Sequence, residues 1–249
     1  MTDMYNYFVA HVAPNSKINS YDVFCGLKIW LVEKAGGIDR CGGKNGKIIK
    51  YNEKKFIDEL CSGKNPTIFL CSERIWGKGD WSEALNCHFS ARFTSTEDIV
   101  LSVCAEKIAL HELVDSFFRI LSISGLVDYA YSYCETHAYG FSYAAGVFTP
   151  DDEHPLLWPR SSEVGMWWKK QRAGATDSFI RDVYPVNIFS DRKLSALPPE
   201  KRTALESAMK RFGVCDTRGK FTVWALDNHE LETVRTELKA VELLASYCP

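Results

Sequence analysis

The spacing of hydrophobic positions changes repeatedly along this chain of 249 residues, and each change separates two predicted elements. Paired strands with helices between them favour an α+β fold, with a mixed, largely antiparallel sheet, helices packed on it and an amphipathic C-terminal helix. Apolar residues three and four positions apart predict helices at 21–34, 53–61, 108–123, 200–211 and 227–245. Runs rich in β-branched and aromatic residues predict strands at 5–12, 47–51, 67–71, 85–93, 99–105, 127–135, 214–217 and 221–226.

The first predicted helix spans 21–34 and ends at the glycine pair 36–37. Its period directs Phe24 and Leu27 toward the core, together with either Ile29 or Leu31. The pattern alone leaves that last choice open.

The segment 85–93 alternates strictly, which is typical of a strand with one buried and one exposed face. Cys87, Phe89 and their neighbours two residues apart form the predicted inner face, and His88, Ser90 and Arg92 belong to the predicted outer face. The strand at 99–105 is its expected antiparallel partner.

The segment 149–160 contains three prolines and three acidic residues, which predicts a surface loop. The tryptophan pair at 167–168 then indicates a short helical turn. No repeat and no low-complexity linker interrupts the chain, so we expect one domain over 1–249, with a weak subdivision near 150–160.

Composition places the chain among globular proteins, with 46% hydrophobic and 25% charged residues. The N-terminus has no basic leader before an apolar run, and no apolar stretch approaches the roughly 20 residues of a membrane helix. These features predict a cytoplasmic protein that does not bind membranes. The nine scattered cysteines are then expected to be reduced thiols, most of them buried.

Charge is distributed unevenly, although the net charge is only -2. Residues 93–159 contain ten acidic and two basic residues, whereas residues 160–220 contain thirteen basic and seven acidic ones. Such blocks can be dispersed over a folded surface, or they can form an acidic face for a basic partner. A sequence pI near 6.3 argues against direct nucleic-acid binding.

Candidate catalytic chemistry is sparse. Cys134 and His137, with Glu135 or Asp128, could supply a thiolate, a base and an orienting acid. Because Cys134 continues an alternating strand, a buried thiol is the favoured interpretation. The spacing of His, Cys, Asp and Glu predicts no metal site and no cofactor.

The run RDVYPVNIFS at 181–190, followed by Leu194, resembles the immunity protein 52 family of bacterial polymorphic toxin systems and related type VI secretion immunity proteins. A looser likeness extends over 178–245. The signature residues have structural chemistry: a Tyr-Pro step favours an extended turn, and charged and amide groups can satisfy the backbone. They are Arg181, Asp182, Tyr184, Pro185 and Asn187.

The resemblance implies a cytoplasmic immunity protein, not an enzyme, that binds a cognate secreted toxin. Such toxins are commonly nucleases with a restriction-endonuclease fold, and the immunity protein blocks the active site or the DNA groove. A nuclease groove is basic, so an acidic inhibitor surface suits it. We therefore expect Asp151, Asp152 and Glu153 to contact the toxin, with Trp158 as an apolar anchor.

Two alternatives from other classes stay open at this point. One is a hydrolase or transferase that uses Cys134 and His137, which requires both side chains in one pocket within hydrogen-bond reach. The other is an interaction module without a toxin.

Overall fold

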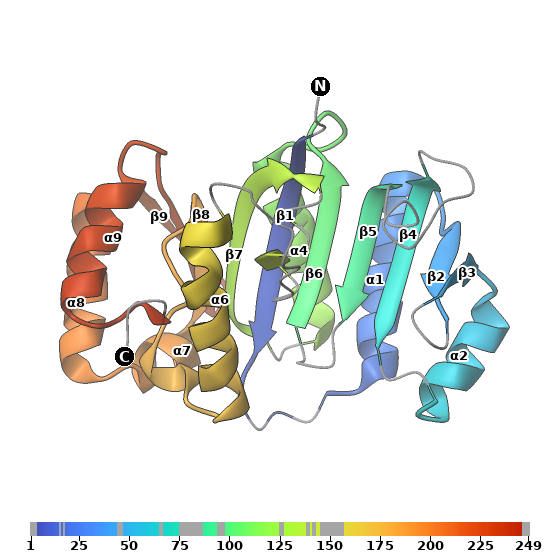
Figure 1. Cartoon of the computed structure of the whole chain (residues 1–249), viewed down its shortest axis with the longest axis horizontal. Helices are drawn as coiled ribbons and strands as arrows, with labels where there is room; N and C mark the ends of the chain where they lie inside the picture. The colour runs from blue at the N-terminus through green and yellow to red at the C-terminus, as the bar shows by residue number, and fades with distance from the viewer. Residues whose placement is uncertain are drawn as a thin grey trace. The chain divides into compact units, whose positions relative to one another are not determined.

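The computed structural model of the chain describes residues 4–14, 16, 18–43, 47–64, 67–74, 87–93, 98–124, 127–137, 140, 143–144 and 157–245 (Figure 1). Its strands are β1 Met4–Val12, β2 Arg40–Gly42, β3 Ile48–Lys50, β4 Ile68–Arg74, β5 Cys87–Phe93, β6 Asp98–Cys104, β7 Val127–Thr136, β8 Val186–Ser190, β9 Val214–Arg218 and β10 Phe221–Ala225. Its helices are α1 Ser20–Ala35, α2 Glu53–Cys61, α4 Leu110–Ser124, α6 Leu157–Arg172, α7 Asp191–Ala196, α8 Pro199–Arg211 and α9 Leu231–Ala240, with a 3₁₀ turn, η2, at Thr176–Ser178.

The predicted α+β fold with an antiparallel sheet and a C-terminal helix is confirmed. Antiparallel hydrogen bonding joins β2 to β3 and β4, β5 to β4 and β6, β8 to β7 and β10, and β9 to β10. None of the helices that the structure describes has the length and apolar character of a membrane span.

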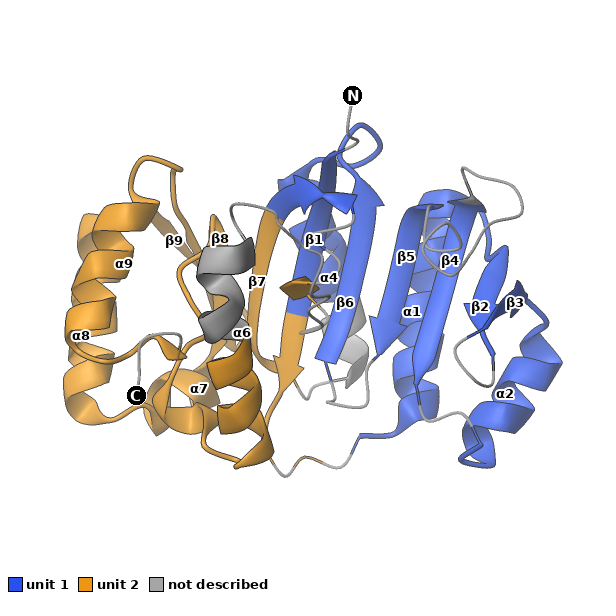
Figure 2. Cartoon of the chain, viewed as in Figure 1, with its two compact units in different colours: residues 1–9, 17–126, 134–141 blue, residues 10–16, 127–133, 142–249 orange. Residues whose placement is uncertain are grey.

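The chain divides into two compact units (Figure 2). Unit 1 comprises residues 1–9, 17–126 and 134–141, and unit 2 comprises residues 10–16, 127–133 and 142–249. Strands β1 and β7 each contribute residues to both units. The expectation of one domain over 1–249 with a subdivision near 150–160 stays a prediction.

Unit 1 has the strand order β3-β2-β4-β5-β6-β1, and α1 packs against β4, β5 and α4. Aromatic rings fill the space between its helices and strands. The rings of Phe8 and Phe117 are 3.8 Å apart between centroids, and Trp30 meets Phe89 edge-on at 6.3 Å. Large aromatic side chains bury much apolar area, so these contacts contribute strongly to the stability of unit 1.

Local signals set the ends of the first two helices. The side chain of Asn19 accepts a hydrogen bond from the amide of Tyr21, and Asn52 caps α2 by accepting from Lys55. Asparagine suits this position because its oxygen replaces a missing intrahelical acceptor. Gly36 ends α1 at φ 74°, where a side chain would be unfavourable.

Unit 2 has the strand order β7-β8-β10-β9, with α8 packed against α9 and β9. The predicted hairpin turns at Gly219, which has φ 61°. The corner between α8 and β9 is tighter, because Gly213 at φ 65° lies against the carbonyl group of Ala225. The indole of Trp224 donates to the carbonyl of Phe212 at 2.8 Å and fixes the same corner.

Three predictions of local structure were wrong, two of them because of contacts with distant residues. Ser90 is buried, because its hydroxyl is 2.7 Å from that of Ser102 on β6. Residues 157–160 are helical, since Pro159 lies in the first turn of α6, where its missing amide proton costs nothing. The C-terminal helix ends at Ala240, because Leu244 pairs in extended form with Ile180.

Replacing Gly213 by alanine is expected to destabilise the protein far more than the same change at Gly219. Both glycines have positive φ, which costs a residue with a side chain about 1–2 kcal/mol. At Gly213 the added methyl group would also overlap the Ala225 carbonyl, whereas at Gly219 it would meet open space. Urea unfolding should show the larger loss for Gly213→Ala, and equal losses would contradict this account of the corner.

Candidate functional site: the signature segment of unit 2

The signature segment, 178–197, is bound into unit 2 at both of its edges. The amide of Ile180 donates to the carbonyl of Leu243 at 3.0 Å, and its carbonyl accepts from Ala245 at 2.8 Å. At the other side, β8 pairs with both β7 and β10. The segment is thus an inner element of this unit rather than a surface loop.

Arg181 is almost completely buried, with 2% of its surface exposed. Its guanidinium donates to the hydroxyl of Tyr131 and, at 2.8 Å, to the carbonyl of Tyr143. The guanidinium carbon also lies 4.3 Å from the centroid of the Tyr143 ring. Aromatic faces and neutral acceptors stabilise this cation, because burial removes the water that would otherwise solvate it.

Asp182 is equally buried, and its carboxylate accepts from Arg235 of α9 at 2.9 Å. The same guanidinium donates to the carbonyl of Val183 at 3.1 Å. An arginine that serves a carboxylate and a neighbouring carbonyl together fixes the position of the chain between them. The two adjacent charges of the signature therefore find partners in different parts of unit 2.

Tyr184, Pro185 and Asn187 form a closed turn that leads into β8. The amide of Asn187 donates to the carbonyl of Tyr184 at 2.6 Å, and its oxygen accepts from the Tyr184 backbone amide at 3.2 Å. Asn187 is fully buried. The Tyr184 ring stacks on that of Tyr131, with centroids 3.9 Å apart, and its hydroxyl is 2.5 Å from that of Tyr143.

A second group of charges lies at the end of β8. Asp128 is buried and accepts from the hydroxyl of Ser190 at 2.6 Å and from Arg192 at 2.9 Å. Arg192 also reaches Asp177 at 2.7 Å. Ser190 in turn caps α7 by accepting from the amide of Lys193 at 3.0 Å. One aspartate thus links β7, β8 and α7.

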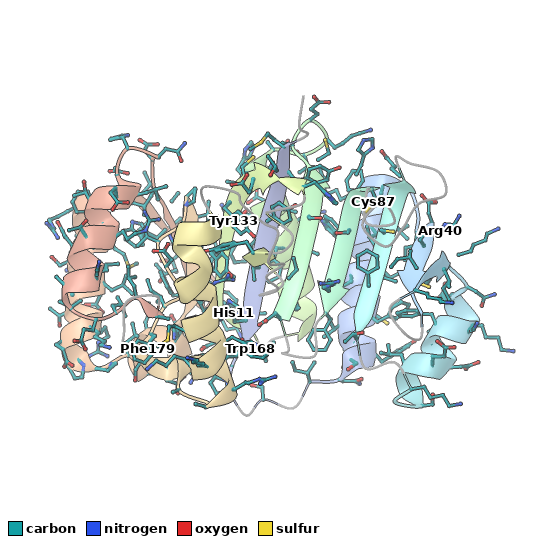
Figure 3. The ribbon with its side chains drawn as sticks, viewed as in Figure 1. His11, Arg40, Cys87, Tyr133, Trp168 and Phe179 are labelled. Carbon is teal, nitrogen blue, oxygen red and sulfur yellow. The ribbon has the colours of Figure 1, made fainter. Side chains whose placement is uncertain are left out.

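Lys193 is buried although it carries an ammonium group. Its Nζ donates to the carbonyls of Thr176 and, at 2.6 Å, Phe179. Burial lowers the pKa of Lys193 from 10.5 to about 8, because the charged form loses its hydration. The ammonium groups of Lys170 and Lys201 lie 4.4 and 4.2 Å from the centroid of the Phe179 ring, which is labelled in Figure 3.

The chemistry of this cluster is that of a structural network. Its hydroxyl, guanidinium and carboxylate groups are directed at one another and at backbone carbonyls inside the unit. Sequence reasoning missed several of its members, most of which come from segments far away in the chain, whereas Lys193 lies in the signature segment itself. The missed residues are Tyr131, Tyr143, Lys193 and Arg235. The alternating aromatic pattern of β7 was a signal for Tyr131.

The predicted toxin-contact residues Asp151, Asp152 and Glu153 lie outside the described residues. Trp158 belongs to α6, but its side chain also lies outside what the structure describes. Their assignment to a contact surface therefore stays a prediction.

Cys134 is exposed on β7, so the expectation of a buried thiol was wrong. Partial burial and the neighbouring Glu135 carboxylate raise the pKa of this thiol. A nucleophilic cysteine needs the opposite shift. The rings of His137 and Tyr5 are tilted by 59° with centroids 4.6 Å apart, and the His137 carbonyl accepts from the Tyr7 hydroxyl at 2.8 Å. The alternative of an enzyme that uses Cys134 and His137 stays a prediction.

Metal and disulfide chemistry can be assessed within the described part of the chain. There, no three His, Cys, Asp or Glu side chains gather closely enough to hold a metal ion. The eight cysteines that the structure describes are free thiols; four of them are buried (Cys41, Cys71, Cys87 and Cys104) and the other four are partly or fully exposed, so the expectation that most are buried is not confirmed.

A cavity of about 510 Å³ lies in unit 1 between β3 and α2. Lys50, Lys55 and Glu59 line it beside apolar side chains, so its charge is mixed. Burial raises the pKa of the Cys41 thiol at its wall to about 11, which leaves that thiol protonated and unreactive. The cavity shows no convergent set of groups for one ligand class.

Comparison with known proteins places few constraints on this chain. No family model matches it, and no curated protein matches its sequence. A Pseudomonas aeruginosa T6SS protein of known structure aligns with 95% of this chain and 73% of its own, at 9% identity and a TM-score of 0.48. Likeness of this degree carries no functional information about the present chain.

Replacing Asn187 by alanine is expected to destabilise the protein by about 2–5 kcal/mol, because the buried amide and carbonyl of Tyr184 each lose a partner worth about 1–3 kcal/mol. Asn52→Ala is the matched control, since it removes a single exposed cap worth about 1 kcal/mol. The free energy of unfolding in urea measures both. A smaller loss for Asn187→Ala than for Asn52→Ala would refute the role given to this turn.

Lys193 is expected to make stability rise with pH between about 8 and 10.5. In that window the unfolded chain keeps the Lys193 proton and the folded chain has lost it, so raising the pH favours the folded state. Relative to Lys193→Met, the free energy of unfolding of the wild type should increase by on the order of 2–3 kcal/mol between pH 8 and pH 10.5. Urea unfolding at several pH values tests this, with Lys210→Met, an exposed lysine on α8, as control.

Proposed function

We propose that this protein is an immunity protein that binds and neutralises a cognate secreted toxin, a nuclease with a restriction-endonuclease fold, by blocking its active site or DNA groove. The observation that carries the proposal is the signature RDVYPVNIFS at 181–190. Its polar residues form one interlocked, buried network, so the run has the character of a fold-determining signature.

A binding role agrees with the chemistry of the described residues. Arg181, Asp182 and Asn187 of the signature form hydrogen bonds inside unit 2, and the pKa of the Cys134 thiol is raised, whereas a nucleophilic cysteine needs a lowered one. The proposal therefore assigns no catalytic residue and no cofactor. It places the protein in the cytoplasm of the bacterium that also produces the toxin.

The test uses the toxin domain encoded next to this gene. The two purified proteins should form a stable complex, and the immunity protein should protect plasmid DNA from that toxin in a cleavage assay. A toxin that cleaves DNA equally well with and without a molar excess of this protein would refute the proposal.

The acidic segment at 151–153 should accelerate binding to that toxin. Asp151→Lys, Asp152→Lys and Glu153→Lys together should lower the association rate constant at least tenfold at low salt and less at high salt, because steering by charge is screened. Stopped-flow association at two salt concentrations measures this. The control reverses three exposed acids elsewhere, Glu106, Glu200 and Glu206. An equal effect of both triple variants would show that only net charge matters.

A further inference from the structure

Helix α1 is apolar on two opposite sides. Val23, Phe24, Leu27, Trp30 and Leu31 face the core of unit 1 and are buried. Three further large hydrophobic side chains of the same helix are exposed: Tyr21 by 41%, Ile29 by 47% and Val32 by 46%. The sequence pattern left open whether Ile29 or Leu31 faces the core. In the structure Leu31 is buried and Ile29 is exposed.

The exposed residues form one continuous surface. Tyr21, Cys25 and Ile29 follow one another at intervals of four, and Val32 lies three residues further, so all four share one side of the helix. We call these four residues the α1 stripe. Single exposed apolar residues are common on proteins. Within the described residues, however, three of the six large exposed hydrophobic side chains belong to this one helix.

Carboxylates border the α1 stripe. Asp22 and Glu33 project beside it from the same helix, and the neighbouring helix α4 exposes Glu112 and Asp115. Two cations beside the stripe face acids, since Lys28 lies 2.5 Å from Glu53 and Arg119 lies 3.6 Å from Glu33. On α1 and α4 the rim thus has four exposed carboxylates against Lys28 and Arg119 around an apolar centre, and a polar rim around an apolar centre is the organisation of a protein-binding surface.

We propose that the α1 stripe and its carboxylate rim form a docking surface for the basic, phosphate-binding groove of the cognate toxin. This inference rests on the function proposed above and adds a contact surface in unit 1 to it. The rim would attract the basic groove and set its orientation, and the exposed stripe would become buried in the complex and supply the apolar contact that slows dissociation.

Charge favours such a partner over a second copy of this chain. In a two-fold antiparallel pairing of α1 with itself, the same edges of both helices meet with their ends exchanged, so Asp22 of each copy would face Glu33 of the other. In a parallel pairing, that edge would meet Lys28, which Glu53 already engages. Like charges across an interface are unfavourable, whereas a basic groove neutralises them.

The binding experiment uses single substitutions on exposed positions and the purified toxin domain encoded by the adjacent gene. Ile29→Lys removes an apolar contact and adds repulsion toward a basic partner, and we expect it to weaken the equilibrium affinity at least tenfold. Glu33→Lys should slow association most at low salt. Val214→Lys, at an apolar residue of β9 that is 71% exposed, is the matched control and should change the affinity less than twofold.

Circular dichroism and urea unfolding first establish that the variants fold. Each binding result then distinguishes the docking surface from the proposed function. Toxin binding by Ile29→Lys and Glu33→Lys at wild-type affinity would overturn the docking surface and leave the proposed function standing. Failure of the wild type to bind the toxin would overturn both. A wild-type dimer in light scattering that Ile29→Lys converts to a monomer would assign the α1 stripe to a second copy, and so reject the toxin as its occupant.

Discussion

The architecture of unit 2 depends on the removal of two adjacent charged side chains, Arg181 and Asp182, from water. A buried charge is tolerated only where polar partners replace its hydration. Arg181 obtains them from Tyr131 and Tyr143, and Asp182 obtains its partner from α9. The strand β7, the segment around 143 and the last helix must therefore all be in place before this dipeptide is stable inside.

Elements that depend on local signals could be predicted from the sequence. α2 begins after Asn52 and ends at Cys61 as expected, because its cap and its apolar spacing lie within ten residues of each other. The hairpin at Gly219 likewise follows from two strands and a residue that accepts positive φ. In both cases the residues that determine where the element begins or ends lie within or directly beside it in the sequence.

Features that depend on distant partners could not be predicted. An alternating pattern places Ser90 on an outer face, and only the hydroxyl of Ser102 on the next strand makes its burial favourable. The partner of Asp182 lies 53 residues away, on a helix whose polar positions resemble ordinary solvated ones. The signature residues could be named from the sequence, but the tyrosines, lysine and arginine that complete their network could not.

The path of the chain between the two units has a practical consequence. The chain passes from one unit to the other five times, at residues 9–10, 16–17, 126–127, 133–134 and 141–142. A single truncation therefore cannot release either unit with all of its strands, because β1 and β7 would lose residues in both directions. Neither unit can be exchanged between related proteins as one contiguous gene segment. Recombination that combined the signature segment of one protein with unit 1 of another would have to preserve both β1 and β7.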